Sequence, residues 1–215
     1  NSQTLVAIAR DVSERHLLDE ERRRADFQTL QFQVALLELG QSQSSNLEEF
    51  LTHVTALSAA TLDVARVSVW VYSETYAEIR CAHLFDREQG LHESGAALEV
   101  ERYPRHFGAL RDFRTIAACD ARNDPLTAEL TDYLAARGTV SVLDVPIRRE
   151  GKPIGVLCHE HTGQPRRWKL DEQNFAASLA DLTALALETD RRRLAEFELR
   201  ESLSNLELFF SQSLD

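Results

Sequence analysis

One segment of this sequence is too long to be contained in a single compact domain. From Phe175 to Phe210 the chain has no glycine or proline, and leucines stand at multiples of seven residues, at Leu185, Leu199 and Leu206. A helix of about 35 residues at 1.5 Å per residue is about 50 Å long, which exceeds the diameter of one domain. We therefore expect this helix to leave its domain and to present an apolar face to a second chain.

A second seven-residue repeat lies near the start of the chain, before Gly40. It consists of Leu18, Ala25, Phe32 and Leu39, and a second apolar stripe beside it consists of Phe27, Leu30, Val34 and Leu37. A heptad repeat keeps one face of a helix against a partner helix, so residues 14–44 are predicted to form a linker helix of a parallel homodimer. An amphipathic helix packed on its own domain fits residues 27–39 equally well.

The composition limits the classes of function. The chain has 215 residues, 43% of them hydrophobic, which supports one sizeable domain with flanking elements. A net charge of −11 argues against nucleic acid or an anionic membrane surface as the main partner. The sequence contains neither a membrane-spanning run of about 20 apolar residues nor a signal peptide pattern. Three cysteines without a CxxC pair fit a reducing compartment, so we expect a cytoplasmic location.

The central residues, 45–188, alternate predicted helices and strands and indicate an α/β (α+β) domain. Asn46 is placed to cap a helix that ends near Leu62. The other expected elements are strands at 66–72, 78–85 and 115–119, a loop at 89–93, and helices at 103–110 and 124–137. Residues 140–148 and 153–161 are predicted to pair as a hairpin, because Glu150-Gly151-Lys152 between them suits a tight turn.

This central part resembles the GAF domain family. The hairpin reads V-S-V-L-D-V-P-I over 140–147 and P-I-G-V-L over 153–157, and a Trp168…Asp171…Leu187 stretch follows it. The resemblance implies a central antiparallel sheet with helices on both faces, flanked here by long N- and C-terminal linker helices. It also implies a regulatory sensory module that binds a small molecule, or alternatively a ligand-free domain that dimerises the chain and relays signals.

The two ends of the chain resemble parts of PAS domains. Residues 1–13 look like the last strand of a preceding PAS-like domain, with a strand expected at 5–9 and Ser13 as a helix cap. Residues 189–215 look like a signalling helix and the start of a following PAS-like domain. The first residue is Asn1 and the sequence has no Met, so we expect a piece of a longer protein. A PAS–GAF–PAS series implies a bacterial signalling protein with a histidine kinase or diguanylate cyclase as output domain. No kinase or cyclase signature occurs in these residues, so we expect no enzyme activity from them.

The resemblance places a ligand cavity between the sheet and a layer of short helices and loops at 84–137. Side chains alternate along a strand, and we expect two sets on the hairpin to face this cavity. With the further walls, the predicted ligand-binding residues are Trp70, Tyr72, Tyr103, Phe107, Leu130, Leu134, Ser141, Leu143, Val145, Leu157, His159 and His161. A packed core without a cavity is the competing prediction.

Three alternatives for this domain involve other chemistry. His159 and His161, with His83 or Asp120, would suit a metal ion, but hydrogen-bonded cavity residues fit two histidines at this spacing better, and we expect no metal. Reduction of methionine sulfoxide would need a reactive thiolate among Cys81, Cys119 and Cys158. In bilin photoreceptors of the family, a cysteine and a histidine would fall near Pro125 and Leu130. Neither residue type is present there, so the cofactor stays unknown and a covalent bilin is not expected.

Overall fold

The computed structural model of the chain describes residues 2–42, 44, 46–112 and 115–212, with side chains described for 15, 19–20 and 22–205 among these. The chain divides into two compact units, residues 1–41 and 42–215. Among the described helices, none contains a stretch long and apolar enough to cross a membrane.

The first unit is one helix, α1 (Ser2–Gln41). The strand predicted at 5–9 is therefore wrong, and Ser13 lies inside the helix rather than at its start. A single strand needs a neighbouring strand for its backbone groups, and the described part of this unit has none, whereas a helix pairs them internally. Phe27, Leu30 and Leu37 are more than half exposed. The side chain of Leu18 lies outside the described residues.

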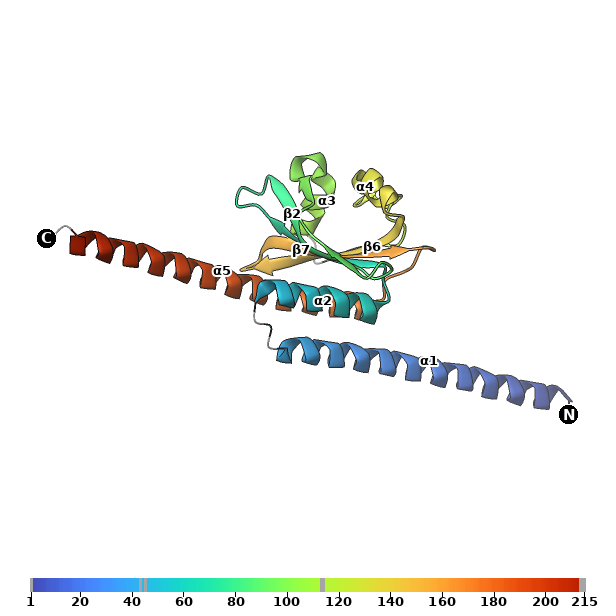
Figure 1. Cartoon of the computed structure of the whole chain (residues 1–215). Helices are drawn as coiled ribbons and strands as arrows, with labels where there is room; N and C mark the ends of the chain where they lie inside the picture. The colour runs from blue at the N-terminus through green and yellow to red at the C-terminus, as the bar shows by residue number, and fades with distance from the viewer. Residues whose placement is uncertain (1, 43, 45, 113–114, 213–215) are drawn as a thin grey trace. The chain divides into compact units, whose positions relative to one another are not determined.

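The second unit contains the predicted antiparallel sheet with helices on both faces (Figure 1). In the described residues the sheet has seven strands in the order β3-β2-β1-β7-β6-β5, and β4 also pairs with β2. The strands are β1 (Arg66–Tyr72), β2 (Glu78–Asp86), β3 (Leu91–Glu93), β4 (Ala97–Glu99), β5 (Ile116–Ala118), β6 (Thr139–Arg149) and β7 (Lys152–Thr162). The helices are α2 (Leu47–Leu62), α3 (Pro104–Asp112), α4 (Thr131–Ala136) and α5 (Leu170–Gln212), with 3-10 turns η1 (Val100–Arg102) and η2 (Ala128–Leu130).

Two layers of helices cover the sheet. α2 and α5 lie against one face, and α3 and α4 lie over the other (Figure 1). The first turn of α2 is stabilised as predicted, because the side chain of Asn46 accepts a hydrogen bond from the backbone N–H of Glu49 at 2.9 Å. α5 is 43 residues long and continues beyond the sheet, which confirms the long C-terminal helix.

The segment 84–137 differs from its prediction in two places. Residues 91–93, expected in a loop, form the short strand β3. The helix expected from residue 124 begins only at η2 and α4, after a series of turns. In these turns Asp124 accepts a bond from the N–H of Leu126, and the hydroxyl of Thr127 donates to the carbonyl of Ala121. Such side-chain bonds compete with helix formation, which explains the delayed start.

The β6–β7 hairpin is formed as predicted. Its two turn residues, Glu150 and Gly151, both have positive φ, of 51° and 80°. Two consecutive residues with positive φ are characteristic of the type I′ turn, whose twist matches that of paired strands. The two strands form the centre of the sheet together with β1 and connect both layers.

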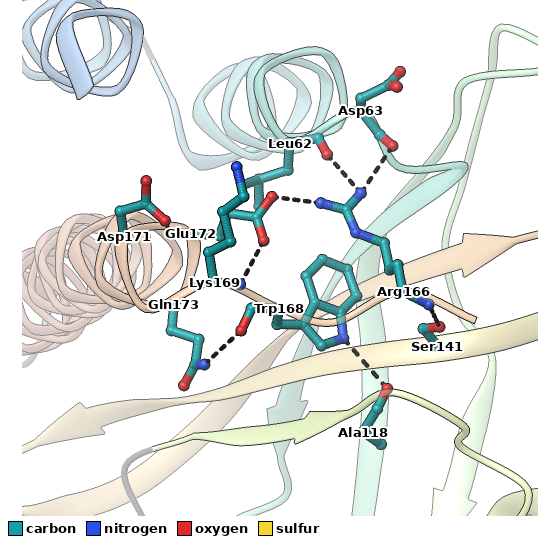
Figure 2. Close-up of polar contacts among 10 residues, drawn as sticks. All are labelled: Leu62, Asp63, Ala118, Ser141, Arg166, Trp168, Lys169, Asp171, Glu172 and Gln173. Carbon is teal, nitrogen blue, oxygen red and sulfur yellow. Dashed lines mark hydrogen bonds and ion pairs between the residues drawn. The ribbon is translucent and has the colours of Figure 1, made fainter. Parts of the chain in front are cut away.

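The connection from β7 to α5 is held by Arg166 (Figure 2). Its guanidinium donates to the carbonyls of Leu62 and Asp63 at the end of α2, at 3.0 and 3.3 Å, and to the carboxylate of Glu172 in the first turn of α5. The backbone N–H of Arg166 donates to the hydroxyl of Ser141 on β6 at 3.0 Å. One side chain therefore joins the end of α2 to the start of α5.

The neighbouring Trp168 fixes the same connection to the sheet. Its indole N–H donates to the carbonyl of Ala118 on β5 at 3.3 Å, and the guanidinium of Arg166 lies 4.4 Å from its ring (Figure 2). Glu172 also accepts a bond from the backbone N–H of Lys169, which caps the start of α5.

Gly155 allows β1 and β7 to approach closely, and we expect Gly155→Ala to destabilise the fold by at least about 2 kcal/mol. A Cβ atom at this position would lie 2.2 Å from the carbonyl oxygen of Trp70, which is backbone and has little freedom to move. Urea unfolding measures the change. Gly108→Ala in α3 is the matched control, because its Cβ would meet only Arg111 at 4.0 Å and alanine favours a helix. Equal stability of the two variants would contradict this reading.

Candidate functional site

A small cavity lies between the sheet and the layer of α3 and α4. Its volume is about 40 Å³, and its walls come from β1, β2, β4, β6 and β7 on one side and from α3, η2 and α4 on the other. The lining residues are Trp70, Ile79, Leu98, His106, Phe107, Leu130, Tyr133, Leu134, Val142, Asp144, Val156 and Cys158. This is the layer in which the sequence places a ligand cavity, although the cavity is much smaller than the roughly 300–1,000 Å³ of sites for larger ligands.

Six of the twelve predicted ligand-binding residues lie at or beside this cavity. Four of them line it: Trp70, Phe107, Leu130 and Leu134. Tyr72 and Tyr103 pack against Phe107, with ring centroids 6.0 and 6.3 Å from its ring. The structure thus brings the predicted aromatic walls together in one cluster.

The six predicted residues on the hairpin do not line the cavity. They are Ser141, Leu143, Val145, Leu157, His159 and His161, and the strands instead present Val142, Asp144, Val156 and Cys158 to it. The prediction chose the wrong face of both strands. Both faces of β6 and β7 are covered by helices, so both carry buried residues, and hydrophobicity does not distinguish them.

His159 lies against the opposite helix layer. Its Nδ1–H donates to the carbonyl of Leu143, and its Nε2 accepts from the hydroxyl of Ser58 on α2, both at 2.9 Å. Burial lowers the pKa of His159 to about 4, so the ring is neutral at pH 7. Because both ring nitrogens are hydrogen-bonded, His159 offers no free nitrogen to a metal ion. No cluster of three metal-ligating side chains occurs within the described residues.

Ser141 and His161, the other two polar hairpin residues of the predicted set, lie where β7 connects to α5. The hydroxyl of Ser141 donates to the carbonyl of Cys119 at 2.6 Å and accepts the N–H of Arg166. His161 is half-buried, and its pKa is lowered by burial and by Arg166. These contacts belong to the connection between β7 and α5.

The cavity contains a polar group that the sequence analysis missed. Asp144 is 2% exposed, and its Oδ2 lies 3.6 Å from the Nε2 of His106 on α3. The Nδ1–H of His106 donates to the carbonyl of Leu126 at 3.0 Å, which orients Nε2 toward the carboxyl group. The signal was available in the sequence: Asp144 is a carboxyl group in the otherwise apolar run 142–147 of the strand.

Two polar atoms of the cavity walls have no hydrogen-bond partner. Among the described side chains, the buried atoms without a partner are Asp144 Oδ1 and Tyr133 Oη, and both residues line the cavity. A buried polar atom left without a partner costs about 1–3 kcal/mol. The two atoms therefore mark the part of the cavity where a hydrogen-bonding ligand would be stabilised.

Burial dominates the protonation of the cavity groups. It raises the pKa of Asp144, although the attraction of His106 and the nearby thiol of Cys158 act in the opposite direction. Burial also raises the pKa of Tyr133 and that of Cys158, the latter well above its ordinary value. The cavity thus disfavours negative charge on each of its own ionisable groups unless a positive charge is close to it.

These shifts argue against thiolate chemistry. Burial raises the pKa of Cys81 to about 11, and Cys158 is shifted in the same direction, whereas a reactive cysteine needs a lowered pKa. Cys119 is half-buried. Neither strand cysteine therefore has the environment that methionine sulfoxide reduction requires.

A buried ion cluster lies on the same strands, and none of its atoms is among the buried, partnerless atoms of the described side chains. Arg66 Nε donates to Glu160 at 2.9 Å, Arg66 Nη1 lies 3.6 Å from Asp86, and Arg66 Nη2 donates to Thr139 at 2.9 Å. Thr139 in turn donates to Glu160 at 2.7 Å. This cluster joins β1, β2, β6 and β7, and its internal pairing indicates a structural role.

Comparison with known proteins identifies relatives of this fold. The profile of the family described as GAF domain matches residues 46–187. A GAF domain of a phosphoenolpyruvate-protein phosphotransferase from Coxiella burnetii is similar, with 18% identity, a TM-score of 0.64, and coverage of 78% of this chain and 98% of that chain. No curated protein shows a significant match.

Two similar structures come from photoreceptors. One is the phycoerythrobilin-bound GAF domain from a cyanobacterial phytochrome, with 19% identity, a TM-score of 0.66, and coverage of 76% of this chain and 98% of that chain. The other is the blue-light absorbing form of the PixJ GAF domain of Thermosynechococcus elongatus, with 21% identity, a TM-score of 0.57, and coverage of 70% and 89%. At these identities the likeness shows the fold.

The neutral, buried ring of His159 should make the stability of the domain pH-dependent. An unfolded chain takes up a proton near pH 6.5, whereas the folded chain does so only near pH 4, so stability is full above pH 6.5 and falls as the pH decreases between these values. We expect a loss of about 2 kcal/mol between pH 7 and pH 5, which urea unfolding at each pH measures.

The variant His159→Gln should remove this part of the pH dependence while lowering stability at pH 7, because the bonds to Ser58 and Leu143 are lost. His53→Gln, at a half-exposed position of α2, is the control and should keep the pH dependence of the unchanged chain. A His159→Gln variant with the original pH dependence would contradict the assignment.

Proposed function

Because the chain belongs to the GAF domain family, we propose that it is a regulatory sensory module. In this proposal a small molecule binds in the cavity between the sheet and α3 and α4. Binding changes the packing of the linker helices α1 and α5 in a dimer, and these helices transmit the signal to an output domain outside this segment. The competing proposal is a ligand-free domain that only dimerises the chain and relays signals.

The unpaired carboxyl oxygen of Asp144 is the observation that favours ligand binding. A domain used only as a spacer would be more stable with an apolar side chain at this position, because the carboxyl group is buried and Oδ1 has no partner among the described residues. Tyr133 Oη has the same property on the opposite wall. A ligand that bonds to these two atoms would recover the energy that their burial costs.

The two strands behind the cavity also contact the helix layer that would carry the signal. Asp144 and Cys158 face the cavity, while their neighbours Leu143 and His159 face away from it. His159 bonds to Ser58 on α2, so a shift of β6 or β7 caused by a ligand changes the position of a group bonded to that helix. Transmission requires the ligand to bind the two helix arrangements with different affinity.

A second contact reaches α5 where it leaves the sheet. Arg149, at the end of β6, donates to Glu188 on α5 at 3.1 Å. Glu188 also pairs with Arg191 and Arg192, at 3.6 and 3.0 Å, on the helix itself. This cluster lies at the predicted boundary between the domain and the signalling helix. A movement of the β6–β7 hairpin would therefore shift the Arg149–Glu188 contact at this boundary.

A bilin fits this cavity less well than a ligand of only a few atoms. One of the similar structures is a phycoerythrobilin-bound GAF domain from a cyanobacterial phytochrome. In this chain Pro125 and Leu130 occupy the positions near which the bilin-binding cysteine and histidine would fall. A tetrapyrrole is also far larger than a cavity of about 40 Å³. The proposal therefore does not include a covalent bilin.

The long helices support a homodimer. On α5, Leu185, Leu199 and Leu203 are more than half exposed and, at 100° per residue, share one face of the helix. The side chain of Leu206, predicted on the same face, lies outside the described residues. On α1, Phe27, Leu30, Val34 and Leu37 are likewise exposed. Exposed apolar rows of this kind are stabilised by a partner helix.

The proposal also covers the neighbouring domains, the output domain and the cellular location. The flanks 1–13 and 189–215 are proposed to border PAS-like domains, and a histidine kinase or diguanylate cyclase is proposed as the output. A cytoplasmic location is supported by the three cysteines, which are all free.

Thermal unfolding in the presence of nucleotides, haem, bilins, small acids and small amines tests the sensory function. A compound at 100 times its dissociation constant should add about 2.7 kcal/mol to the free energy of unfolding. In Asp144→Leu this gain should disappear. The ligand-free variant should itself be more stable than the unchanged chain at pH 7, because a buried carboxyl group with a raised pKa is removed.

A result without any stabilising compound, together with the expected stabilisation by Asp144→Leu, would instead support the ligand-free relay. If a compound does bind, hydrogen exchange of α5 beyond Glu188 reports transmission. Unchanged exchange in this segment would contradict coupling between the cavity and the helix.

Introducing a charge into the apolar row of α5 should weaken the dimer. We expect Leu199→Asp to raise the dimer dissociation constant at least about tenfold, because the interface would bury an unpaired charge. Ser204→Asp places the same charge on another face of α5, at an exposed position, and serves as the control. Light scattering over a concentration series gives the mass of both variants. A dimer that tolerates Leu199→Asp as well as Ser204→Asp would argue against this interface.

A further inference from the structure

The walls of the cavity combine aromatic rings with one carboxyl group. Trp70 and Tyr133 meet edge to face with ring centroids 6.2 Å apart, and Phe107 forms a further wall. Asp144 is the one acidic residue among the described lining residues, none of them is lysine or arginine, and the one histidine, His106, lies beside Oδ2 of the same carboxyl group. Aromatic faces and carboxylates both attract cations, so the charge distribution of the walls favours a positive ligand.

We propose that the ligand of this cavity is a small organic ammonium ion, bound between the carboxyl group of Asp144, the hydroxyl of Tyr133 and the aromatic walls. This proposal rests on the sensory function and specifies the chemical class of its ligand. It uses the two buried atoms that otherwise lack partners.

The hydrogen-bonding atoms of the cavity match an ammonium group. Asp144 Oδ1 accepts hydrogen bonds, the oxygen of Tyr133 accepts as well, and an ammonium ion supplies up to three N–H donors. Oδ2 of the same carboxyl group faces His106, so Oδ1 is the oxygen left for a ligand. A positive ion beside Asp144 also compensates the burial that otherwise disfavours the carboxylate. An anion would gain no such partner, because Asp144 and the nearby Glu160 both repel it.

The volume limits the size of the ligand. A buried water needs about 10–15 Å³ on a comparable scale, so about 40 Å³ holds roughly three groups of that size. Methylammonium and dimethylammonium, with two and three non-hydrogen atoms, have the right size, whereas tetramethylammonium would require the cavity to widen. The small contact area implies binding in the millimolar range.

Titration of the 215-residue chain with methylammonium chloride, followed by amide chemical shifts, tests the proposal. Sodium acetate and methanol, at equal ionic strength, are the anionic and neutral probes of similar size. We expect saturable shifts at residues 133, 144 and 158 with methylammonium and none of comparable size with the other two probes.

Two variants separate the contributions of the walls. Asp144→Asn keeps the shape and removes the charge, and should raise the dissociation constant of methylammonium at least about tenfold. Tyr133→Phe removes only the hydroxyl and should raise it severalfold. The control is Asp112→Asn, at an exposed position of α3, which should leave binding unchanged. Melting curves of each variant verify that the domain remains folded.

The outcomes distinguish the two levels of the proposal. Saturable binding of acetate or methanol without methylammonium would overturn the ammonium assignment and leave the sensory function intact. Methylammonium binding that is unchanged in both Asp144→Asn and Tyr133→Phe would overturn the assigned contacts. If no probe and no compound of the thermal unfolding series binds, and Asp144→Leu is more stable, the sensory function fails as well.

Discussion

The structure of this domain depends on two strands that each serve two layers at once. In β6 and β7 every step of one residue moves the side chain from the layer of α3 and α4 to the layer of α2 and α5. Asp144 and Cys158 therefore belong to the cavity, and Leu143 and His159 to the helices. Because the same backbone holds both sets, a displacement of the strands on one face would also move the side chains on the other. In the proposed function, the sheet would therefore connect the cavity to α2 and α5 as well as form one of its walls.

The buried charged residues of the sheet differ in how completely they are paired, and this difference distinguishes a structural cluster from the candidate site. Arg66 and Glu160 are buried as well, with exposed fractions of 8% and 1%, but they pair with each other, with Asp86 and with Thr139. The hydrogen-bonding groups of such a cluster are engaged within the fold and are not directed at a ligand. Asp144 has one oxygen near His106 and one without a partner, so its energetic cost is not recovered within the described part of the chain. Incomplete pairing, more than burial, distinguishes the candidate site.

The elements that depend on local signals were predictable from the sequence. The cap at Asn46, the β6–β7 turn at Glu150-Gly151 and the unbroken α5 are encoded by neighbouring residues. The GAF fold was predicted from a family resemblance of the hairpin and of the stretch that follows it. The strand expected at 5–9 failed because strand formation needs a distant partner, whereas a helix does not. The cavity face of the hairpin failed for a similar reason. Both faces are buried, and only the packing of α3, α4 and α2 decides which one each residue joins.

The position of Arg166 restricts how the helices of this layer can move. One guanidinium group holds the last carbonyls of α2 and the first turn of α5, and its backbone is bonded to β6 (Figure 2). At this end the two helices form a common hinge point that cannot separate without breaking several charge-assisted bonds. A rotation of α5 would therefore pivot at this end and increase along the helix, past Glu188, which Arg149 ties to the hairpin. A small rotation of α5 within the fold would therefore produce a larger displacement in the exposed half of the helix, beyond the sheet.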